Sequence, residues 1–316
     1  MMPQPEAARE TPMNAAERTA YHLTDDQIRF FDANGYLVLR DWVPAELLAR
    51  LQAAGQAWIA DGLRHAPATA GDDYNFAQRP GGPALFRVNY LHNKGQAASL
   101  ELLGAPQLLA VAESLCGPNF VPTYESLVFK QAGDGEKIPW HQDAVQPTRN
   151  YRIFNFDLYL DPSLRGAGAL RVIPGTHTMR QDICALADAY GWDHPDAIEV
   201  EMQPGDVLLH NVMVVHGSPQ VAGKQLRRTI YYEFRPAEEI LEDGPWDAGW
   251  IERRMRLVAL GLAAHRSAYP EREQYTWRVS DSFRPTPLGS EAAELKVAHE
   301  VHMSGAYCSA GDAGRA

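Results

Sequence analysis

Short apolar runs separated by glycine and proline turns fill residues 120–236, and this texture restricts the possible folds more than any other feature of the chain. The runs are rich in β-branched and aromatic residues, and they span 125–130, 153–160, 169–173, 206–210, 212–216 and 228–234. Turn signals such as Gly166-Ala167-Gly168 and Pro204-Gly205 lie between them. Regularly spaced short strands without intervening helices indicate an antiparallel sandwich or barrel. We therefore expect a mainly β fold.

Helices are expected on both sides of this β region. Thr24 followed by Gln27 is a capping box that starts a helix, and Asn34-Gly35 ends this helix before a strand at 36–39. Further helices are expected from Pro44, over 98–116, over 180–190 and over 246–264, whereas residues 66–84 have the composition of a loop.

These patterns predict a single domain at 21–290. Its barrel core would span about 120–236, and flanking helices at 24–116 and 246–264 would support the barrel. Residues 1–20 are polar and unpatterned, so we expect a disordered N-terminal tail. Residues 291–316 would form a C-terminal extension.

The charge and cysteine content exclude several classes of protein. Forty acidic residues against 29 basic ones give a net charge of −11, which argues against binding of nucleic acid or of an anionic membrane. The sequence has no apolar run of about 18 residues, so no membrane span is expected. Three widely spaced cysteines suit a reducing compartment, and we expect a cytoplasmic protein.

His141 and Asp143 form the first candidate pair for chemistry. In an extended strand, alternate side chains point to the same side, so an imidazole nitrogen and a carboxylate oxygen can face one point. This pair suits a divalent transition metal. On its own, the pair is a weak signal, and a histidine and an aspartate that are simply hydrogen-bonded to each other are the favoured interpretation.

His216 is the candidate for a third ligand. It closes an apolar run and precedes the turn residues Gly217 and Ser218, so its side chain is expected at the rim of the sheet. Two histidines and one carboxylate form the facial triad of Fe(II) oxygenases, which leaves coordination positions open. His210 is a rival, because six residues separate it from His216 and strand parity would place both on one face if the strand is unbroken.

Arg227 is the candidate for binding an anion. Along the run that follows it, Arg227, Thr229 and Tyr231 share one face by parity, and Arg228 lies on the other. A guanidinium inside a barrel needs an anionic partner, and its planar fork binds a carboxylate with two hydrogen bonds. The alternatives are an arginine solvated at a strand start or one paired with a structural acid such as Asp157.

Five ordered segments resemble the phytanoyl-CoA dioxygenase-like branch of the Fe(II)/2-oxoglutarate oxygenases. They are residues 23–39, Trp140-His141-Gln142-Asp143, residues 168–177, residues 204–218, and Arg227 at the family's spacing from the distal histidine. The resemblance covers roughly 23–236 and implies a double-stranded β-helix, the jelly-roll or cupin-like barrel. It implies that His141, Asp143 and His216 are the catalytic residues and ligate Fe(II). Arg227 would hold the distal carboxylate of 2-oxoglutarate.

The resemblance extends to two further residues of the cosubstrate site. Relatives place a lysine near the cosubstrate at the position of Lys130, and Ser218 shares strand parity with His216 and would bind the same carboxylate. The alternatives are a solvated lysine at a strand end and a hydroxyl that caps a turn. Arg87 and Asn89 face either the pocket or the packed side of a strand.

The implied activity is that of an Fe(II)- and 2-oxoglutarate-dependent dioxygenase that uses O2, oxidises a C–H bond of a small-molecule metabolite, and releases succinate and CO2. A carboxylate at Asp143 argues for hydroxylation or a related oxidation, because halogenases of this fold carry a small residue there. The expected partner is a small-molecule substrate, and the protein would be a monomer or a homodimer. The alternative is a cupin-like protein that binds a metal or a small molecule without catalysis.

Overall fold

The computed structural model describes residues 19–79, 81–130, 137–144, 152–220, 226–289, 294–295 and 306–307. The expected N-terminal tail, up to residue 18, and nearly all of the C-terminal extension at 291–316 lie outside the described residues. The described helices are α1 (Asp25–Asn34), α2 (Ala45–Gly62), α3 (Ala98–Leu103), α4 (Pro106–Cys116), α5 (Ile183–Tyr190), α6 (Ala237–Asp243) and α7 (Ala248–Ala268). None of them combines the length and the apolar composition that crossing a bilayer requires.

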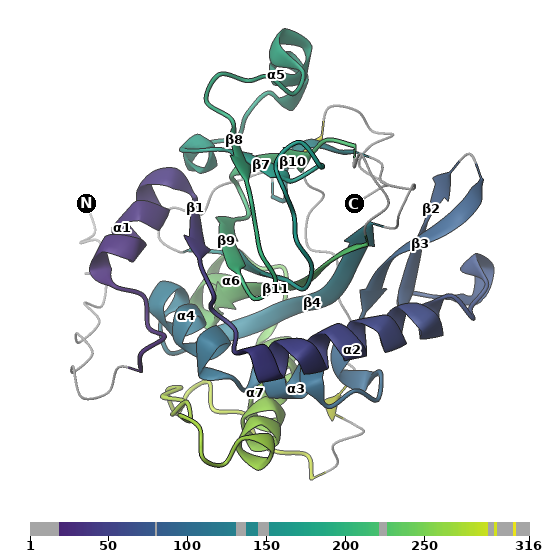
Figure 1. Cartoon of the computed structure of the whole chain (residues 1–316). Coiled ribbons are helices and arrows are strands. Elements are labelled where there is room, and N and C mark those ends of the chain that lie inside the picture. The colour runs from purple at the N-terminus through teal and green to yellow at the C-terminus, as the bar shows by residue number, and fades with distance from the viewer. Residues whose placement is uncertain are drawn as a thin grey trace, which may run out of the picture.

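The strands pair into two antiparallel sheets (Figure 1). The larger sheet has the order β1-β9-β6-β11-β4-β3-β2, and the smaller has the order β12-β5-β10-β7-β8. The strands are β1 (Tyr36–Leu39), β2 (Tyr74–Arg79), β3 (Gly82–Asn89), β4 (Phe120–Lys130), β5 (Ile138–Gln142), β6 (Phe154–Tyr159), β7 (Leu170–Ile173), β8 (Ile198–Val200), β9 (Val207–Asn211), β10 (Val215–Ser218), β11 (Arg227–Pro236) and β12 (Ala306–Tyr307).

The eight strands from β4 to β11 form the expected jelly roll. β4, β6, β9 and β11 belong to the larger sheet, whereas β5, β7, β8 and β10 belong to the smaller one. This alternation between two facing sheets is the connectivity of a double Greek-key jelly roll. The prediction of a mainly β fold with flanking helices is confirmed.

Alternation along β6 separates a packed face from a polar one. Phe154, Phe156 and Leu158 are fully buried in the main core, which β6 shares with helices α2, α3, α4 and α7 on the outer face of the larger sheet. Figure 1 shows α2, α3 and α7 lying beneath this sheet. The intervening residues Asn155 and Asp157 point to the opposite face, toward the interior of the barrel. The core thus fixes the strands whose other face carries the site.

Two local predictions need correction. Residues 66–84, expected as a loop, contain β2 and the start of β3, a hairpin that extends the larger sheet beside β4. The single helix expected at 98–116 is two helices, because Gly104-Ala105 interrupts it before Pro106 starts α4. The start of the fold agrees with expectation: Thr24 and Gln27 form both hydrogen bonds of the capping box, and Gly35 ends α1 with a φ of 76°.

Two glycines allow α3 and α7 to lie against each other. A Cβ atom on Gly104 would collide with the carbonyl oxygen of Gly261 in α7. A Cβ atom on Gly261 would lie 2.9 Å from the backbone nitrogen of Gly104, closer than real contacts of this kind. The backbone contact at this point therefore requires glycine on both sides.

Arg228 ties three elements together on the outer face. Its Nε and Nη2 each donate to the carboxylate of Asp161 at 2.8 Å, and its Nη1 donates to the carbonyl of Gln52 in α2 at 2.8 Å. Arg228 is buried, and it points away from Arg227 as parity predicted. It is a structural cation, so lysine is not a neutral replacement for it.

We expect Arg228→Lys to lower the free energy of unfolding by about 1.5–3 kcal/mol, because lysine keeps the charge but loses the bidentate contact. Urea denaturation of the purified variant measures this change. Arg29→Lys is the control, since Arg29 forms an ion pair with Asp26 in which both side chains are exposed. Exposed pairs contribute about 0–1 kcal/mol, so the control is expected to stay close to the parent protein. Equal stability of Arg228→Lys and the parent would contradict the structural role.

Candidate metal centre

His141 and His216 lie on neighbouring strands of the smaller sheet. The register of β5 and β10 pairs His216 directly with His141, and their ring centroids are 4.1 Å apart. Both side chains are buried. Antiparallel pairing puts directly opposed side chains on the same face, so two histidines far apart in the sequence point to one place.

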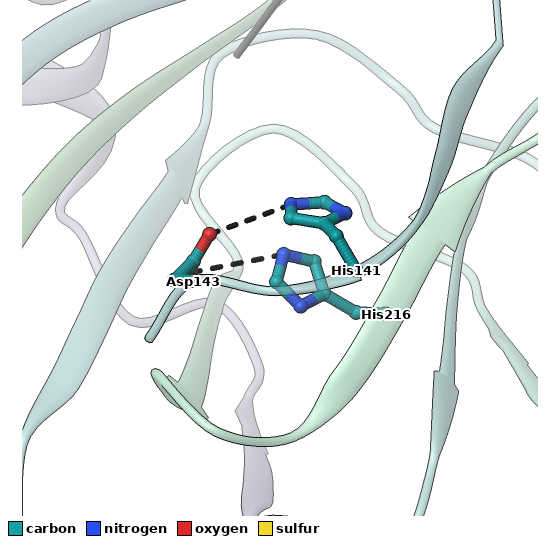
Figure 2. Close-up of side chains that lie close together, drawn as sticks. All are labelled: His141, Asp143 and His216. Carbon is teal, nitrogen blue, oxygen red and sulfur yellow. Dashed lines mark ion pairs between the residues drawn. The ribbon is translucent and has the colours of Figure 1, made fainter. Parts of the chain in front are cut away.

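Asp143 completes the cluster from just beyond the end of β5. Its backbone N–H donates to the carbonyl of Val212 at 2.8 Å, which fixes the chain as it leaves the strand. Its Oδ1 lies 3.4 Å from Nε2 of His141, and its Oδ2 lies 3.8 Å from Nε2 of His216 (Figure 2). One ligand atom from each of the three residues falls within 4.8 Å of the others, which is the spacing of a metal site.

Both imidazoles are oriented for metal binding by the backbone. Nδ1 of His141 lies 2.8 Å from the carbonyl of Pro139, and Nδ1 of His216 lies 3.0 Å from the carbonyl of Val214. A carbonyl only accepts, so each Nδ1 carries the proton and each Nε2 presents its lone pair to the cluster. This is the tautomer that metal-bound histidines adopt.

The protonation states also suit a metal. Burial acts to raise the pKa of Asp143, but His216, His141 and His210 outweigh burial and hold the pKa well below its ordinary value. Burial, together with His141 and His210, lowers the pKa of His216 to about 3. The cluster therefore offers a charged carboxylate and a neutral imidazole, the forms that bind metals.

His210, the rival to His216, has different surroundings. Its Nδ1 lies 2.8 Å from Oδ2 of Asp157, and its Nε2 lies 3.2 Å from Oδ2 of Asp143. Burial lowers the pKa of His210, but these two carboxylates outweigh burial and raise it to about 10. Nε2 of His210 also lies 3.0 Å from Nδ2 of Asn155. At this raised pKa His210 carries a proton on each ring nitrogen at neutral pH, so it has no lone pair to give to a metal. Asp157 pairs with His210 and not with Arg227, the structural alternative considered for that arginine.

Lys130, Ser218 and Arg227 gather beside the cluster. Lys130 ends β4 directly opposite Arg227, which starts β11. Nζ of Lys130 donates to Oγ of Ser218 at 2.6 Å, and Ser218 lies two residues after His216 on β10. Arg227 donates to the carbonyl of Gly168 and, at 3.2 Å, to Oγ of Ser163. The structure thus brings the three expected cosubstrate residues together.

This corner of the barrel holds positive charge without a matching acid. Within the described part of the chain, no carboxylate lies within ion-pair distance of Lys130 or Arg227. Burial, followed by the cations of Arg227 and Arg79, lowers the pKa of Lys130 to about 6. Lys130 is buried and Arg227 partly buried, and burying a cation is costly without a counter-charge, so the arrangement favours an anionic ligand that would charge Lys130 on binding.

Of the other two residues considered for the pocket, Asn89 is tied into the strands. It donates to the carbonyl of Asp72 at 2.7 Å and accepts from the hydroxyl of Tyr124 at 3.0 Å. Arg87 shares its face with Arg227, because Arg87 and Thr229 both pair with Val128. Its Nε is buried without a hydrogen-bond partner. Arg87 is therefore a further cation on the inner face of the sheet.

Two residues of the centre escaped sequence reasoning. Gln142 is fully buried between His141 and Asp143 and donates to the carbonyl of Met213 at 2.6 Å, which links β5 to the turn before β10. Asn155 donates to Oδ2 of Asp143 at 3.0 Å. The polar residue at every second position of β6 was a signal for Asn155, but its partner became visible only when the sheets were assembled.

The family is decided by a profile match. The sequence profile of the phytanoyl-CoA dioxygenase family matches residues 31–229, more than half of the chain. The chain belongs to the phytanoyl-CoA dioxygenase family. The resemblance noted in the sequence is thereby confirmed, and the protein is an oxidoreductase of the dioxygenase class.

Individual relatives are distant. The human peroxisomal phytanoyl-CoA dioxygenase is 22% identical over 242 residues, which cover 68% of this chain and 69% of the human protein. The crystal structure of EvdMO1 is 30% identical with a TM-score of 0.59, and the match covers 67% of this chain but only 50% of EvdMO1. EctD from S. alaskensis with bound Fe is 23% identical with a TM-score of 0.57, covering 75% of this chain and 85% of EctD. The likeness to EctD shows the fold alone.

We expect His141→Ala, Asp143→Ala and His216→Ala each to abolish tight Mn(II) binding while the metal-free fold is retained, because each variant removes one ligand from the rim of the barrel. Anaerobic calorimetry measures the binding, and thermal unfolding in chelator checks the fold. His177→Ala is the control, since His177 contacts the backbone carbonyl of Asp32 and lies outside the cluster. Parental Mn(II) affinity in Asp143→Ala would refute the ligand set.

Proposed function

We propose that the protein is an Fe(II)- and 2-oxoglutarate-dependent dioxygenase that hydroxylates, or otherwise oxidises, an unactivated C–H bond of a small-molecule metabolite, with release of succinate and CO2. The observation that carries this proposal is the buried pair of histidines whose Nε2 atoms face Asp143, next to a corner of the barrel where Lys130 and Arg227 have no carboxylate partner among the described residues. The two histidines and Asp143 fit a divalent metal, and the neighbouring basic residues fit a dicarboxylate.

His141, Asp143 and His216 would hold the iron. Fe(II) bound there would supply the redox chemistry that activates O2, and three protein ligands leave positions open for the cosubstrate and for O2. The family match and the EctD structures, one with bound Fe and one with 2-oxoglutarate and 5-hydroxyectoine, support these cofactors. The protein's own residues fix the tautomers of the two histidines and keep Asp143 charged.

Arg227, Lys130 and Ser218 would bind the distal carboxylate of 2-oxoglutarate. The guanidinium offers a planar fork, the ammonium offers a compact charge, and the hydroxyl that already contacts Lys130 offers a further donor. Arg87 would meet a second anionic group, either on the cosubstrate or on the primary substrate. These cations occupy the barrel interior of a chain whose net charge is −11, which favours a local role in binding an anion.

The alternative function is binding without catalysis. Succinate that forms only when Fe(II), 2-oxoglutarate and a primary substrate are all present would establish the enzyme, and screening a metabolite library for 2-oxoglutarate consumption is the direct route to the substrate. Failure of the purified protein to bind iron under anaerobic conditions would overturn the proposal. The expected cytoplasmic location and oligomeric state remain predictions, and the human relative is named as a peroxisomal enzyme.

We expect Arg227→Lys to raise the apparent 2-oxoglutarate constant at least about tenfold, because charged hydrogen bonds contribute roughly 1.5–3 kcal/mol and about 1.4 kcal/mol corresponds to tenfold. The primary-substrate constant should change much less. Steady-state kinetics measure both constants. Arg165→Lys is the control, because Arg165 is an exposed arginine in the loop that also carries Ser163 and Gly168. A raised 2-oxoglutarate constant in Arg165→Lys together with a parental constant in Arg227→Lys would contradict the assignment of the cosubstrate site to Arg227.

We expect 2-oxoglutarate to bring a proton with it when it binds. Lys130 has a pKa of about 6 in the free protein, so at a pH of about 7.5 it is mostly neutral, and a bound carboxylate raises its pKa and charges it. Affinity should therefore rise as the pH falls toward about 6 and level off below that. Calorimetry in two buffers with different ionisation enthalpies measures the proton uptake.

The matched variants for this test are Lys130→Met, which should lose the proton uptake, and Lys137→Met, which should keep it because Lys137 is exposed. Equal uptake in Lys130→Met and the parent protein would show that another group supplies the linkage.

A further inference from the structure

Asp143 is held from two sides. On one side are His141 and His216 of the smaller sheet, and on the other are Asn155 of β6 and His210 of β9 in the larger sheet. Asn155 and His210 are direct register partners, so their side chains emerge together from the inner face. Both are buried, and His210 is only 1% exposed.

The two carboxylate oxygens of Asp143 have different surroundings. Oδ1 faces Nε2 of His141 at 3.4 Å. Oδ2 accepts from Nδ2 of Asn155 at 3.0 Å and lies 3.2 Å from Nε2 of His210, closer than the 3.8 Å that separates it from Nε2 of His216. Nδ2 of Asn155 and Nε2 of His210 are themselves 3.0 Å apart, so both are donors to Oδ2 when Nε2 is protonated. An oxygen that accepts two hydrogen bonds has little remaining capacity to bind a metal.

Asp157 fixes the orientation of His210. Its Oδ2 lies 2.8 Å from Nδ1 of His210, and both residues are almost fully buried. When Nε2 of His210 carries a proton, that proton points at Oδ2 of Asp143, whether the proton between Asp157 and His210 resides on the oxygen or on the nitrogen. The contact with Asp143 therefore does not depend on which of the two groups is charged.

Asp143 needs such support because it lies outside the regular strand. β5 ends at Gln142, and the hydrogen bond from Asp143 to Val212 fixes the backbone but leaves the carboxylate free to rotate. A carboxylate that rotated to bind through both oxygens would occupy a coordination position that the cosubstrate or O2 requires.

We propose that His210 and Asn155 are positioning residues that engage Oδ2 of Asp143, so that Asp143 gives the metal a single oxygen and one more coordination position stays open. This inference rests on the proposed metal site. His210 was the alternative to His216 as a metal ligand. Its proposed role is instead to keep Asp143 from binding the metal through both oxygens.

The experiment uses Mn(II), whose bound water molecules can be counted by water-proton relaxation. With three protein ligands, about three of six positions hold water, and a bidentate Asp143 would leave about two, so relaxivity per bound Mn(II) should fall by about one third. We expect this fall in His210→Leu and in Asn155→Leu. The Mn(II) affinity of both should also weaken by about 10- to 100-fold, the usual effect of losing a partner of a metal ligand.

Three further variants separate positioning from general damage. His210→Gln keeps an amide donor near the place of Nε2 and should retain parental relaxivity. Asn155→Leu leaves the Asp157–His210 pair intact, so it serves as the test if His210→Leu fails to fold. His265→Leu removes a buried histidine of α7 whose Nδ1 contacts the carbonyl of Glu101, away from the metal centre, and should change nothing at the metal.

Parental relaxivity in both leucine variants would overturn the inference, even if their affinity were lower, because the coordination would then be unchanged. If relaxivity falls in His210→Leu but stays parental in Asn155→Leu and His210→Gln, the positioning role belongs to His210 alone. Absence of Mn(II) binding by the parent protein would instead refute the proposed metal site, so the two failures are distinguishable.

Discussion

The centre depends on the backbone pairing of β5 with β10, which sets His141 opposite His216. Once this register is fixed, the other groups follow by position: Asp143 lies just beyond the end of β5, and Ser218 lies two residues along β10. A shift of this register by one residue would turn one histidine to the opposite face of the sheet, and the three ligands would no longer lie together. The core on the outer face of the larger sheet matters to the chemistry because it holds the opposing strands in place.

The positions of most strands were readable from the sequence because short apolar runs alternate with turn residues, whereas the jelly roll itself was implied by the resemblance to the family. The β2–β3 hairpin was not readable from the sequence, because its strands contain Gly82, Pro83 and Asn75 and few β-branched residues. Its strand character comes from pairing with β4, a contact that no local pattern encodes. In the same way, Gly104-Ala105 was too short an interruption to divide one expected helix into α3 and α4.

For the site, alternation along one strand predicted which side chains share a face. The sequence did not predict which side chains of different strands contact each other. Alternation separated Arg227 from Arg228, and the structure places them on opposite faces. The same rule put His210 on one strand face with His216, but this expectation was wrong, because the chain turns between them and they lie on β9 and β10 of different sheets. The rule also did not reveal that His210 lies between Asp143 and Asp157. The difference between a ligand and its support lies in the strand that carries each histidine: His216 is paired with His141 across β5 and β10, whereas His210 lies on β9 of the larger sheet, between Asp143 and Asp157. That information exists only in three dimensions.

The crossing of α3 and α7 at Gly104 and Gly261 affects how conserved positions in this family should be interpreted. The crossing lies in the helical layer on the outer face of the larger sheet, yet neither position has room for a side chain. Relatives that preserve this helix crossing should therefore keep the smallest residue at both places, whatever substrate they act on. An invariant glycine at either position would reflect the close packing of two helices. A search for catalytic residues that ranks positions by invariance alone would therefore select these glycines wrongly.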